Sequence, residues 1–281
     1  MNYQLGLIGS PIKHSLSPWI HSHLLEKAGL QGTYQLLEVE KNELFHEQIK
    51  QLKASSIHGF NVTVPYKEAI IPFLDHLDAS AAGVGAVNTV VIQHDKWIGY
   101  NTDGIGYVRS LKQAYPKIFS GKNPHILIIG AGGAARGIYD GLARSGMTKI
   151  DIANRTTARA RNITHMHKGH VESTILKIED AELQLGKYDV IIQTTSVGMK
   201  PDEHEQIISL DNLQTSSIVS DIVYQPIMTS FLLDAKNRGA HIHHGHTMLL
   251  YQAQAAFEIW TGKNTDVEDL EKKLQLKLEG N

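Results

Sequence analysis

The stretch HILIIGAGGAAR, residues 125–136, decides the fold class. Its four consecutive apolar residues, Ile126–Ile129, predict a strand buried on both faces, as in a parallel sheet. Gly130, Gly132 and Ala135 follow at once and match G-x-G-x-x-G/A, after which a helix can form. A strand, a glycine turn and a helix in this order predict a dinucleotide site, because a pyrophosphate can approach the free N–H groups of the helix N-terminus.

Strand and helix signals alternate on both sides of this stretch. Downstream we expect strands over 149–153, 190–194, 218–222 and 241–243, and helices over 134–144, 157–165 and 228–237, which is a doubly wound pattern. Upstream we expect strands over 4–9, 34–39 and 59–64, helices over 17–28, 41–53 and 67–74, and a hairpin of 88–92 and 97–100 that turns at His94-Asp95. The helix over 41–53 should bury Leu44, Phe45, Ile49 and Leu52. A connecting helix over 104–119 and a last helix over 248–260 complete the prediction.

The fold class is therefore α/β with two domains, an N-terminal α/β domain for substrate and a doubly wound Rossmann domain for a dinucleotide. A terminal helix often packs back on the first domain, so we expect that domain to be discontinuous. The predicted boundaries are residues 1–103 with 245–281 for the substrate domain, and residues 104–244 for the Rossmann domain.

Composition excludes several classes of function. The 281 residues carry a formal net charge of −2, which gives no general attraction to nucleic acid or an anionic membrane. We see no signal peptide and no apolar run long enough for a membrane span, so we expect a cytoplasmic protein. The absence of cysteine excludes disulfides, a thiol nucleophile and a Cys-ligated zinc site. No Tyr-x-x-x-Lys pair, phosphate-binding G-x-x-x-x-G-K-[ST] loop or H-E-x-x-H motif is present.

The end of the second Rossmann strand indicates which dinucleotide binds. A site that prefers NAD usually has Asp or Glu there, but this chain has Asn154-Arg155-Thr156 followed by Arg159. Two arginines spaced i, i+4 at a helix start repel each other and oppose the helix dipole, and a bound anion removes both penalties. The 2′-phosphate of NADP is such an anion. The alternative is a solvated basic face.

Polar clusters follow or precede several strands of the first domain. They are Ser15-Leu16-Ser17-Pro18, Asn61 to Lys67, Gly85 to Thr89, and Asn101 to Gly104. Hydroxyl and amide groups with one lysine and one aspartate suit a small polyhydroxylated acid. Each has a structural alternative: Ser17 as a helix N-cap, Lys67 as a surface lysine at a helix start, Asn88 as an internally bonded residue, and Asn101–Gly104 as a turn.

The motifs together resemble the shikimate dehydrogenase family over essentially the whole chain. They are SLSP, NVTVPYK, GAVNT, YNTDG, GAGGAAR, NRTTAR, TTSVGM, DIVYQP and GHTMLLYQ. The resemblance implies NADPH-dependent, reversible reduction of 3-dehydroshikimate to shikimate, on the path to chorismate and the aromatic amino acids.

The resemblance also implies roles for individual residues. Ser15 and Ser17 would hold the substrate carboxylate, Lys67 would be the catalytic residue, and Asp103 its partner. The substrate would further meet Thr63, Asn88, Tyr224 and Gln252. NADP would be bound by Gly130, Ala131, Gly132, Gly133, Ala134, Ala135, Arg136, Asn154, Arg155, Thr156, Arg159, Gly245 and Met248. The chemistry of the residues agrees, because carbonyl reduction needs a proton donor for the developing alkoxide and a lysine ammonium is one.

Three other functions stay open at this point. They are a quinate/shikimate dehydrogenase that accepts NAD, a non-catalytic NADP sensor, and a folate-cycle dehydrogenase of similar architecture. Arg155 and Arg159 count against the first, and the Lys67–Asp103 pair counts against the second. The serine pair with Asn88 and Asp103 fits a carboxylated polyol better than a pterin. His241, His243, His244 and His246 resemble a metal-binding tract, but without cysteine or clustered carboxylates we expect an exposed strand end and no metal. We expect a monomer or homodimer.

Overall fold

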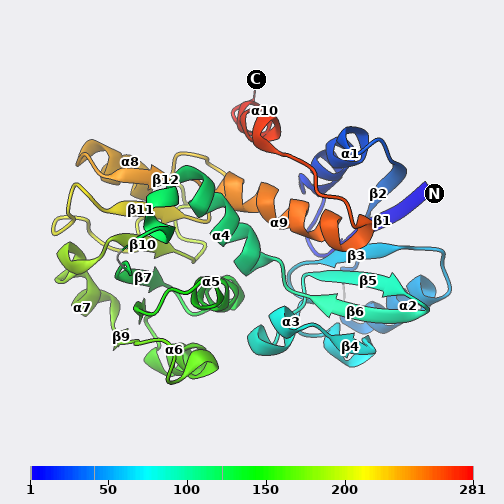
Figure 1. Ribbon diagram of the computed structural model, residues 1–281, viewed down its shortest axis with the longest axis horizontal. Helices are drawn as coiled ribbons and strands as arrows, with labels where there is room; N and C mark the ends of the chain where they lie inside the picture. Colours follow the sequence, from blue (N-terminus) through cyan, green and yellow to red (C-terminus); the bar gives the residue numbers. More distant parts are fainter. Residues whose placement is uncertain (1, 41, 122, 281) are drawn as a thin grey trace. The chain divides into compact units, whose positions relative to one another are not determined.

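The computed structural model describes residues 2–40, 42–121 and 123–280 (Figure 1). These residues form two compact units. Unit 1 comprises residues 1–102 and 252–270, and unit 2 comprises residues 103–251 and 271–281. Each unit has its own six-stranded sheet, which confirms the predicted two-domain α/β class.

The sheet of unit 2 is parallel throughout, in the order β12-β11-β10-β7-β8-β9. Its strands are β7 (Ile126–Ile129), β8 (Ile150–Ala153), β9 (Ile175–Leu176), β10 (Val190–Gln193), β11 (Ile218–Asp221) and β12 (His241–His243). The chain runs outward from β7 in one direction to β9 and then returns to β10 on the other side. This reversal between β7 and β10 is the switch point at which open α/β sheets bind ligands.

Helices cover both faces of this sheet. They are α4 (Asp103–Ala114), α5 (Gly133–Arg144), α6 (Thr157–Thr164), α7 (Ile178–Glu182) and α8 (Ser230–Asn237), with the 3₁₀ turns η2 (Pro116–Phe119), η3 (His165–His167) and η4 (Leu185–Lys187). Side chains of α4, α5 and α6 pack with alternate sheet residues such as Ile128 and Ile152 in one core. Side chains of α7 and α8 pack with Leu127 and Ile191 in the other. The two cores account for the unbroken apolar run of β7, since its neighbouring residues point to opposite faces.

The sheet of unit 1 is mixed, in the order β2-β1-β3-β5-β6-β4. Its strands are β1 (Asn2–Gly9), β2 (Gln31–Glu38), β3 (Gly59–Val62), β4 (His76–Leu77), β5 (Thr89–Gln93) and β6 (Lys96–Tyr100). β1 runs parallel to β2 and β3, whereas β5 is antiparallel to both β3 and β6. The hairpin of β5 and β6 turns at His94 and Asp95, both with positive φ, as predicted.

Helices also cover both faces of the unit 1 sheet. Its helices are α1 (Ser17–Lys27), α2 (Asn42–Lys53), α3 (Ala79–Val84) and the 3₁₀ turn η1 (Ile71–Phe73). Phe45 and Ile49 of α2 pack with Phe60 and Val90 of the sheet. Trp260 covers the opposite face beside Leu5.

Two C-terminal helices, α9 (Gly245–Thr261) and α10 (Glu268–Leu278), contribute residues to both units.

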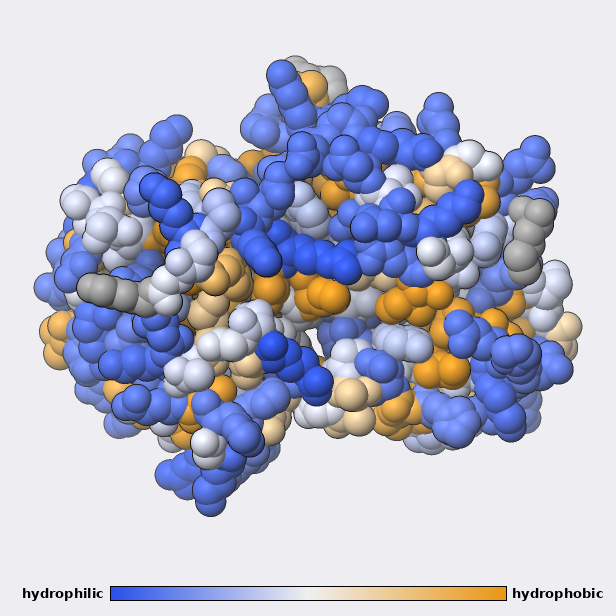
Figure 2. Space-filling model, in the orientation of Figure 1, coloured by the Kyte–Doolittle hydropathy of each residue, from blue (hydrophilic) through white to orange (hydrophobic). Residues whose placement is uncertain are grey.

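Hydrophilic side chains cover much of the face drawn in Figure 2, where apolar residues occur in small groups. Within the described ranges, no helix is both long and apolar enough to cross a membrane.

Several local predictions were wrong. Residues 67–74 form turns and only the short η1, because Pro72 has no N–H group to donate to the carbonyl of Glu68 in an α-helix. The helix predicted over 104–119 ends at Ala114, just before Pro116. Leu44 is half exposed, unlike its three buried partners in α2. Lys41, the predicted start of that helix, lies outside the described residues.

Candidate functional site

The polar residues predicted in unit 1 gather at one edge of its sheet. Because β5 is antiparallel to β3 and β6, the start of β5 lies beside the ends of β3 and β6. The chain after β1 carries Ser15 and Ser17, Thr63 follows β3, Asn88 precedes β5, and Thr102 follows β6. The strand directions therefore bring together residues that lie up to 87 positions apart in the sequence, from Ser15 to Thr102.

The serine pair is organised at the start of α1. The Ser15 hydroxyl lies 3.2 Å from the Ser17 hydroxyl and accepts a hydrogen bond from the Ser17 backbone N–H at 3.2 Å. The N-cap position is Leu16, whose own side chain accepts no capping bond, so the Ser15 hydroxyl takes the first N–H of the helix instead. The alternative of Ser17 as the N-cap is thus wrong, because Ser17 is the buried first residue of the helix.

Lys67 lies in the turn that follows β3 and is half-buried. Its carbonyl oxygen accepts the N–H of Val87 at 2.8 Å, and the preceding Tyr66 N–H donates to the carbonyl of Thr63 at 2.9 Å. These backbone bonds hold Lys67 beside the segment that leads into Asn88. No helix begins at Lys67, so the predicted helix start there is wrong.

Asn88 and Thr102 bond to each other through their side chains and backbone. The Asn88 amide donates to the Thr102 hydroxyl at 3.0 Å, and its oxygen accepts the Thr102 N–H at 2.8 Å. Asn88 is therefore internally bonded, as that alternative predicts. Asp103 follows Thr102 directly, as the buried first residue of α4 in unit 2. Gln252 is half-buried in the part of α9 that belongs to unit 1.

Two residues that sequence reasoning did not select link this edge together. The Tyr34 hydroxyl of β2 donates to the side-chain oxygen of Asn61 at 2.7 Å. The Asn61 amide nitrogen donates to the carbonyl of Asn88 and to the hydroxyl of Thr89, both at 3.0 Å. The motif NVTVPYK draws attention to Asn61, but nothing in the sequence around Tyr34 indicates a role for that tyrosine.

The glycine turn of unit 2 has the features that a pyrophosphate requires. Gly130 has φ of +117°, and a Cβ there would lie 2.5 Å from the hydroxyl oxygen of Thr194. At Gly132 and Gly133, by contrast, a Cβ would meet no atom within 4 Å. Gly132 is the N-cap of α5 and provides no side-chain cap, so the first N–H groups of α5 face this open space. The residues present therefore fit a dinucleotide phosphate. Ala135 is fully buried behind the turn, while Ala131, Ala134 and Arg136 are half-buried.

The turn after β8 presents its basic residues to solvent. The Asn154 side chain donates to the carbonyl of Thr156 at 2.8 Å and so holds the turn closed. Arg155 and Arg159 are both exposed. α6 begins at Thr157 with Thr156 as its N-cap, so Arg155 precedes the helix. The two arginines therefore flank the start of α6 at the end of β8, as predicted.

A buried aspartate organises the loops after β10 and β11. Asp221 accepts hydrogen bonds from the Val223 N–H at 2.9 Å, the Thr229 hydroxyl at 2.8 Å and the Gln193 amide at 3.2 Å. Gln193 also donates to the carbonyl of Val197 at 3.0 Å. Burial raises the pKa of Asp221 to about 6, although its three donors oppose that rise. Sequence reasoning missed both Asp221 and Gln193.

The remaining predicted residues of unit 2 lie after β11 and at the start of α9. Tyr224 is half-buried, and burial raises its pKa. Gly245 is required by packing, since a Cβ would overlap the carbonyl oxygen of Ile222. Met248 is buried in the core of unit 2.

The histidines near β12 differ from the prediction. His243 is buried and bonds to the Ser220 hydroxyl at 2.8 Å and the Thr247 hydroxyl at 3.2 Å. His246 is also buried, so only part of this segment is an exposed strand end. Burial lowers the pKa of His243 to about 3 and that of His246 to about 4. In the described part of the chain, no group of three or more His, Asp or Glu residues is placed to hold a metal ion.

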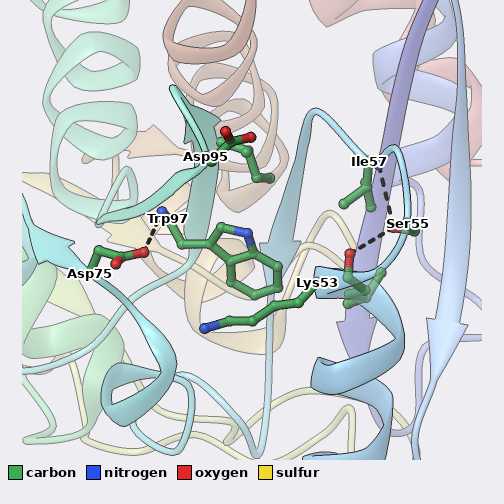
Figure 3. A pocket seen from close by; sticks show the side chains of 8 residues that line it. Lys53, Ser55, Ile57, Asp75, Asp95 and Trp97 are labelled. Carbon is green, nitrogen blue, oxygen red and sulfur yellow. Dashed lines mark hydrogen bonds between the residues drawn. The ribbon is translucent and has the colours of Figure 1, made fainter.

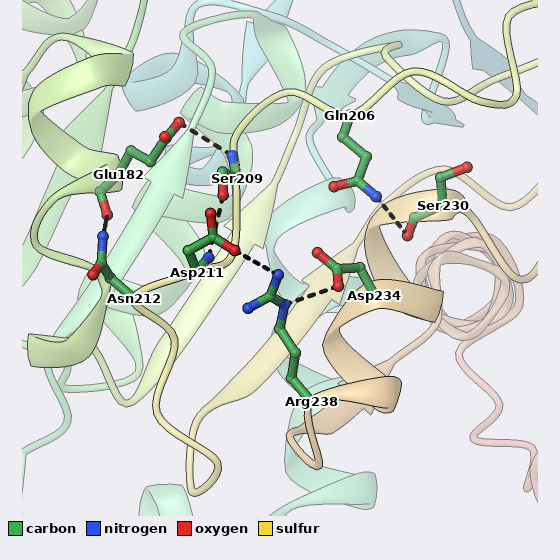
Figure 4. Close-up of polar contacts among 8 residues, drawn as sticks. All are labelled: Glu182, Gln206, Ser209, Asp211, Asn212, Ser230, Asp234 and Arg238. Carbon is green, nitrogen blue, oxygen red and sulfur yellow. Dashed lines mark hydrogen bonds and ion pairs between the residues drawn. The ribbon is translucent and has the colours of Figure 1, made fainter.

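A pocket of about 260 Å³ lies at the other end of β5 and β6 (Figure 3). There the Lys53 ammonium lies 5.2 Å from the centre of the Trp97 ring, and the Asp75 carboxylate accepts the backbone N–H of Trp97 at 2.9 Å. In unit 2, Arg238 bonds to Asp211 at 2.7 Å and to Asp234 at 2.8 Å (Figure 4). This exposed cluster connects the long segment between β10 and β11 to α8. Neither place contains a predicted site residue.

Comparisons with known proteins agree with this arrangement. Residues 7–90 match the family model of the shikimate dehydrogenase substrate binding domain, residues 113–224 that of shikimate / quinate 5-dehydrogenase, and residues 245–275 that of the shikimate 5'-dehydrogenase C-terminal domain. A shikimate dehydrogenase (NADP(+)) of Oceanobacillus iheyensis is 51% identical over the full length of both chains.

Solved structures give the same result. The shikimate dehydrogenase of Aquifex aeolicus is 36% identical with a TM-score of 0.86, and 97% of each chain is covered. The shikimate 5-dehydrogenase of Listeria monocytogenes, solved with shikimate and NAD, is 36% identical with a TM-score of 0.88 over 97% of this chain and 96% of that one. The chain therefore belongs to the shikimate dehydrogenase family.

Proposed function

We propose that this protein catalyses the reversible, NADP-dependent interconversion of 3-dehydroshikimate and shikimate. The observation that carries the proposal is the row of serine, threonine, asparagine and lysine residues at one edge of the unit 1 sheet. Its full-length relative of 51% identity bears the same activity in its name. We propose unit 1 as the substrate-binding domain and unit 2 as the dinucleotide-binding domain.

The substrate would be held by its carboxylate and its ring hydroxyls. Ser15 and Ser17 are paired hydroxyls at the start of α1, and each hydroxyl can rotate to donate to a carboxylate. Thr63 and Asn88, with Tyr224 and Gln252, would bind hydroxyl groups. These interactions are present before and during reaction, so they contribute to affinity more than to rate.

Lys67 is proposed to donate the proton to the developing alkoxide and to accept it in the reverse direction. A lysine ammonium combines a compact positive charge with a transferable proton, which suits an oxygen that gains negative charge. Asp103 would orient Lys67 and hold the hydroxyl that reacts. Its burial at the start of α4 limits competition from water.

The cofactor would be held by unit 2. The uncapped N–H groups at Gly132–Gly133 fit the pyrophosphate, and Arg155 and Arg159 with Asn154 and Thr156 fit the 2′-phosphate. Arg136, Gly245 and Met248 would contact the remainder of the dinucleotide. When bound, NADPH supplies the hydride of the reduction. The proposed reaction requires no metal ion, because the Lys67 ammonium would neutralise the developing alkoxide.

The deciding experiment is spectrophotometric. Purified protein is incubated with shikimate and NADP⁺, and the absorbance of the reduced nicotinamide is followed. We expect a steady increase with shikimate, and a much smaller rate with NAD⁺ or with quinate in place of shikimate. Absence of turnover with shikimate and either cofactor would overturn the proposal, and equal rates with quinate and NAD⁺ would favour the quinate dehydrogenase alternative that the family description includes.

The net charge of −2 fits a protein without nucleic-acid or membrane partners, and we propose a cytoplasmic monomer or homodimer. Light scattering of the purified protein would give its mass in solution.

A further inference from the structure

We propose that Tyr34 is a positioning residue for substrate binding. Its hydroxyl group holds Asn61, and through Asn61 the start of β5, in the arrangement that binds the substrate. This inference rests on the proposed function, because it concerns the same edge of unit 1. It assigns a role to a residue two strands away from Asn61 that the motifs did not select.

The first observation is the complete use of the Asn61 amide group. Its oxygen accepts the Tyr34 hydroxyl at 2.7 Å, and its nitrogen donates to the Asn88 carbonyl and the Thr89 hydroxyl at 3.0 Å each. Because the nitrogen is engaged on the β5 side, the oxygen must face Tyr34. The Asn88 carbonyl can only accept, so it fixes the nitrogen on the β5 side, and removal of the tyrosine hydroxyl leaves the Asn61 oxygen without the donor that holds it from the β2 side.

The second observation is the continuation of these bonds toward Thr102. Asn61 is buried and contacts both the backbone of Asn88 and the side chain of Thr89. Asn88 in turn bonds to Thr102 at 3.0 Å and 2.8 Å. A change at Tyr34 is therefore transmitted through two side chains to the residue that precedes Asp103 in the sequence.

The third observation is the protonation of Tyr34. Burial raises the pKa of Tyr34, so its hydroxyl keeps its proton at neutral pH and can donate it to Asn61.

The fourth observation is the stack that fixes the plane of the Tyr34 ring. The His21 ring lies parallel to it, with 4.4 Å between ring centres and 7° between planes. The Trp260 ring lies beside both rings, with its centre 5.1 Å from that of His21 and 6.3 Å from that of Tyr34, and it is anchored by a bond from its indole N–H to the Val90 carbonyl at 2.9 Å. His21 is fully buried, and neither ring nitrogen has a hydrogen-bond partner among the described residues. His21 therefore acts on Tyr34 through packing and does not compete for its hydroxyl.

The test compares Tyr34→Phe with a matched control, Tyr66→Phe. Tyr66 is also a stacked tyrosine of unit 1, on Phe45 at 4.2 Å, but its hydroxyl donates to the Val39 carbonyl in the core on the other side. Each variant loses one hydroxyl and one hydrogen bond. We expect Tyr34→Phe to raise KM for shikimate by roughly five- to tenfold, the effect of one neutral hydrogen bond, with KM for NADP⁺ unchanged. The same KM for shikimate in both variants would overturn the inference.

A double-mutant cycle with Asn61→Ala distinguishes an effect of Tyr34 on shikimate binding through Asn61 from an independent structural effect. If Tyr34 acts through Asn61, the double variant binds shikimate about as weakly as Asn61→Ala alone. Losses that simply multiply would show that Tyr34 acts independently, and the inference would fail.

A third measurement separates failure of this inference from failure of the proposed function. The side-chain amide signals of Asn61, assigned by their loss in Asn61→Asp, are recorded by NMR in the wild type and in Tyr34→Phe. A shift of these signals in Tyr34→Phe but not in Tyr66→Phe supports the network even if the wild type does not oxidise shikimate. Unshifted signals would overturn the network whatever the activity.

Discussion

Lys67 is held by its backbone in a turn, where its carbonyl accepts the Val87 N–H. If its ammonium supplies the proton, Lys67→Ala should lower kcat by roughly 10²–10⁴-fold, the usual contribution of general acid–base catalysis, with the affinity for NADP⁺ little changed. Steady-state rates with shikimate and a separate cofactor titration measure the two effects. Lys53→Ala is the control, because this lysine of the same unit lies over Trp97 in the pocket of Figure 3. A near-normal kcat in Lys67→Ala would transfer the proton role to another group.

Arg155 and Arg159 provide a second prediction at the level of single residues. Both are exposed at the end of β8, with only Arg159 inside α6. Changing both to glutamine should weaken NADP⁺ on the order of 30-fold or more while NAD⁺ changes little, because only NADP⁺ has the 2′-phosphate. Fluorescence titration of each cofactor measures this ratio. Arg161→Gln, later in the same helix, should leave it unchanged, and equal losses for both cofactors would contradict the assignment.

The buried polar residues that sequence reasoning missed depend on partners far away in the chain. Ser15 and Asn88 could be predicted because each stands beside a strand end that the pattern locates. Tyr34 bonds to a residue 27 positions away, and Gln193 to one 28 positions away. No local pattern reports such a contact, because it depends on which strands become neighbours.

At the scale of elements, α4 and α5 meet at glycines. A Cβ at Gly104 would overlap the carbonyl oxygen of Gly137, and one at Gly141 would lie 2.6 Å from backbone atoms of Gly104. Gly104→Ala should therefore push the two helices apart and lower the free energy of unfolding by about 1–3 kcal/mol, the usual cost of overpacking.

Urea unfolding followed by circular dichroism measures the loss in Gly104→Ala. Gly121→Ala is the matched control, since a Cβ there meets no atom within 4 Å and the backbone needs no positive φ. If both variants unfold at the same urea concentration, the close helix contact does not limit this position.

The elements that sequence patterns predicted best are those with long local signals. β7 consists of four consecutive buried apolar residues, β10 has three before the buried Gln193, and α5 follows a glycine turn. The pattern missed β9 and β4, because two residues are too few to show a period. It also missed α3, α7 and α10, and it extended the helix of 104–119 through Pro116. Short strands and helices depend on contacts with the rest of the folded unit, and their local sequence does not reveal those contacts.

At the scale of the whole molecule, three buried histidines make stability depend on pH. Burial lowers the pKa of His21 and of His243 to about 3, and that of His246 to about 4. Below about pH 6.5 the unfolded chain binds protons at these histidines and the folded chain does not, so stability falls as pH falls. Each histidine should lower the free energy of unfolding by about 2 kcal/mol between pH 8 and pH 5.

Asp221 opposes this trend. Its pKa of about 6 in the folded protein lies above the value of an unfolded aspartate, so the folded state gains a proton first and is stabilised by about 1 kcal/mol at pH 5. The net expectation is a loss of several kcal/mol, measured by urea unfolding at the two pH values. High salt should leave the loss in place, because desolvation of buried groups is not screened as surface repulsion is. A stability that is equal at both pH values would contradict the burial of these rings.

The glycine contact between α4 and α5 has a mechanical consequence. Asp103 is bonded covalently to Gly104, and Gly104 rests directly on the backbone of α5, whose first residues follow the turn at Gly130–Gly132. No flexible side chain intervenes between the two helices at that point. Asp103 is therefore carried on the same rigid frame as the glycine turn at Gly130–Gly132, so that any motion of unit 2 moves the two together.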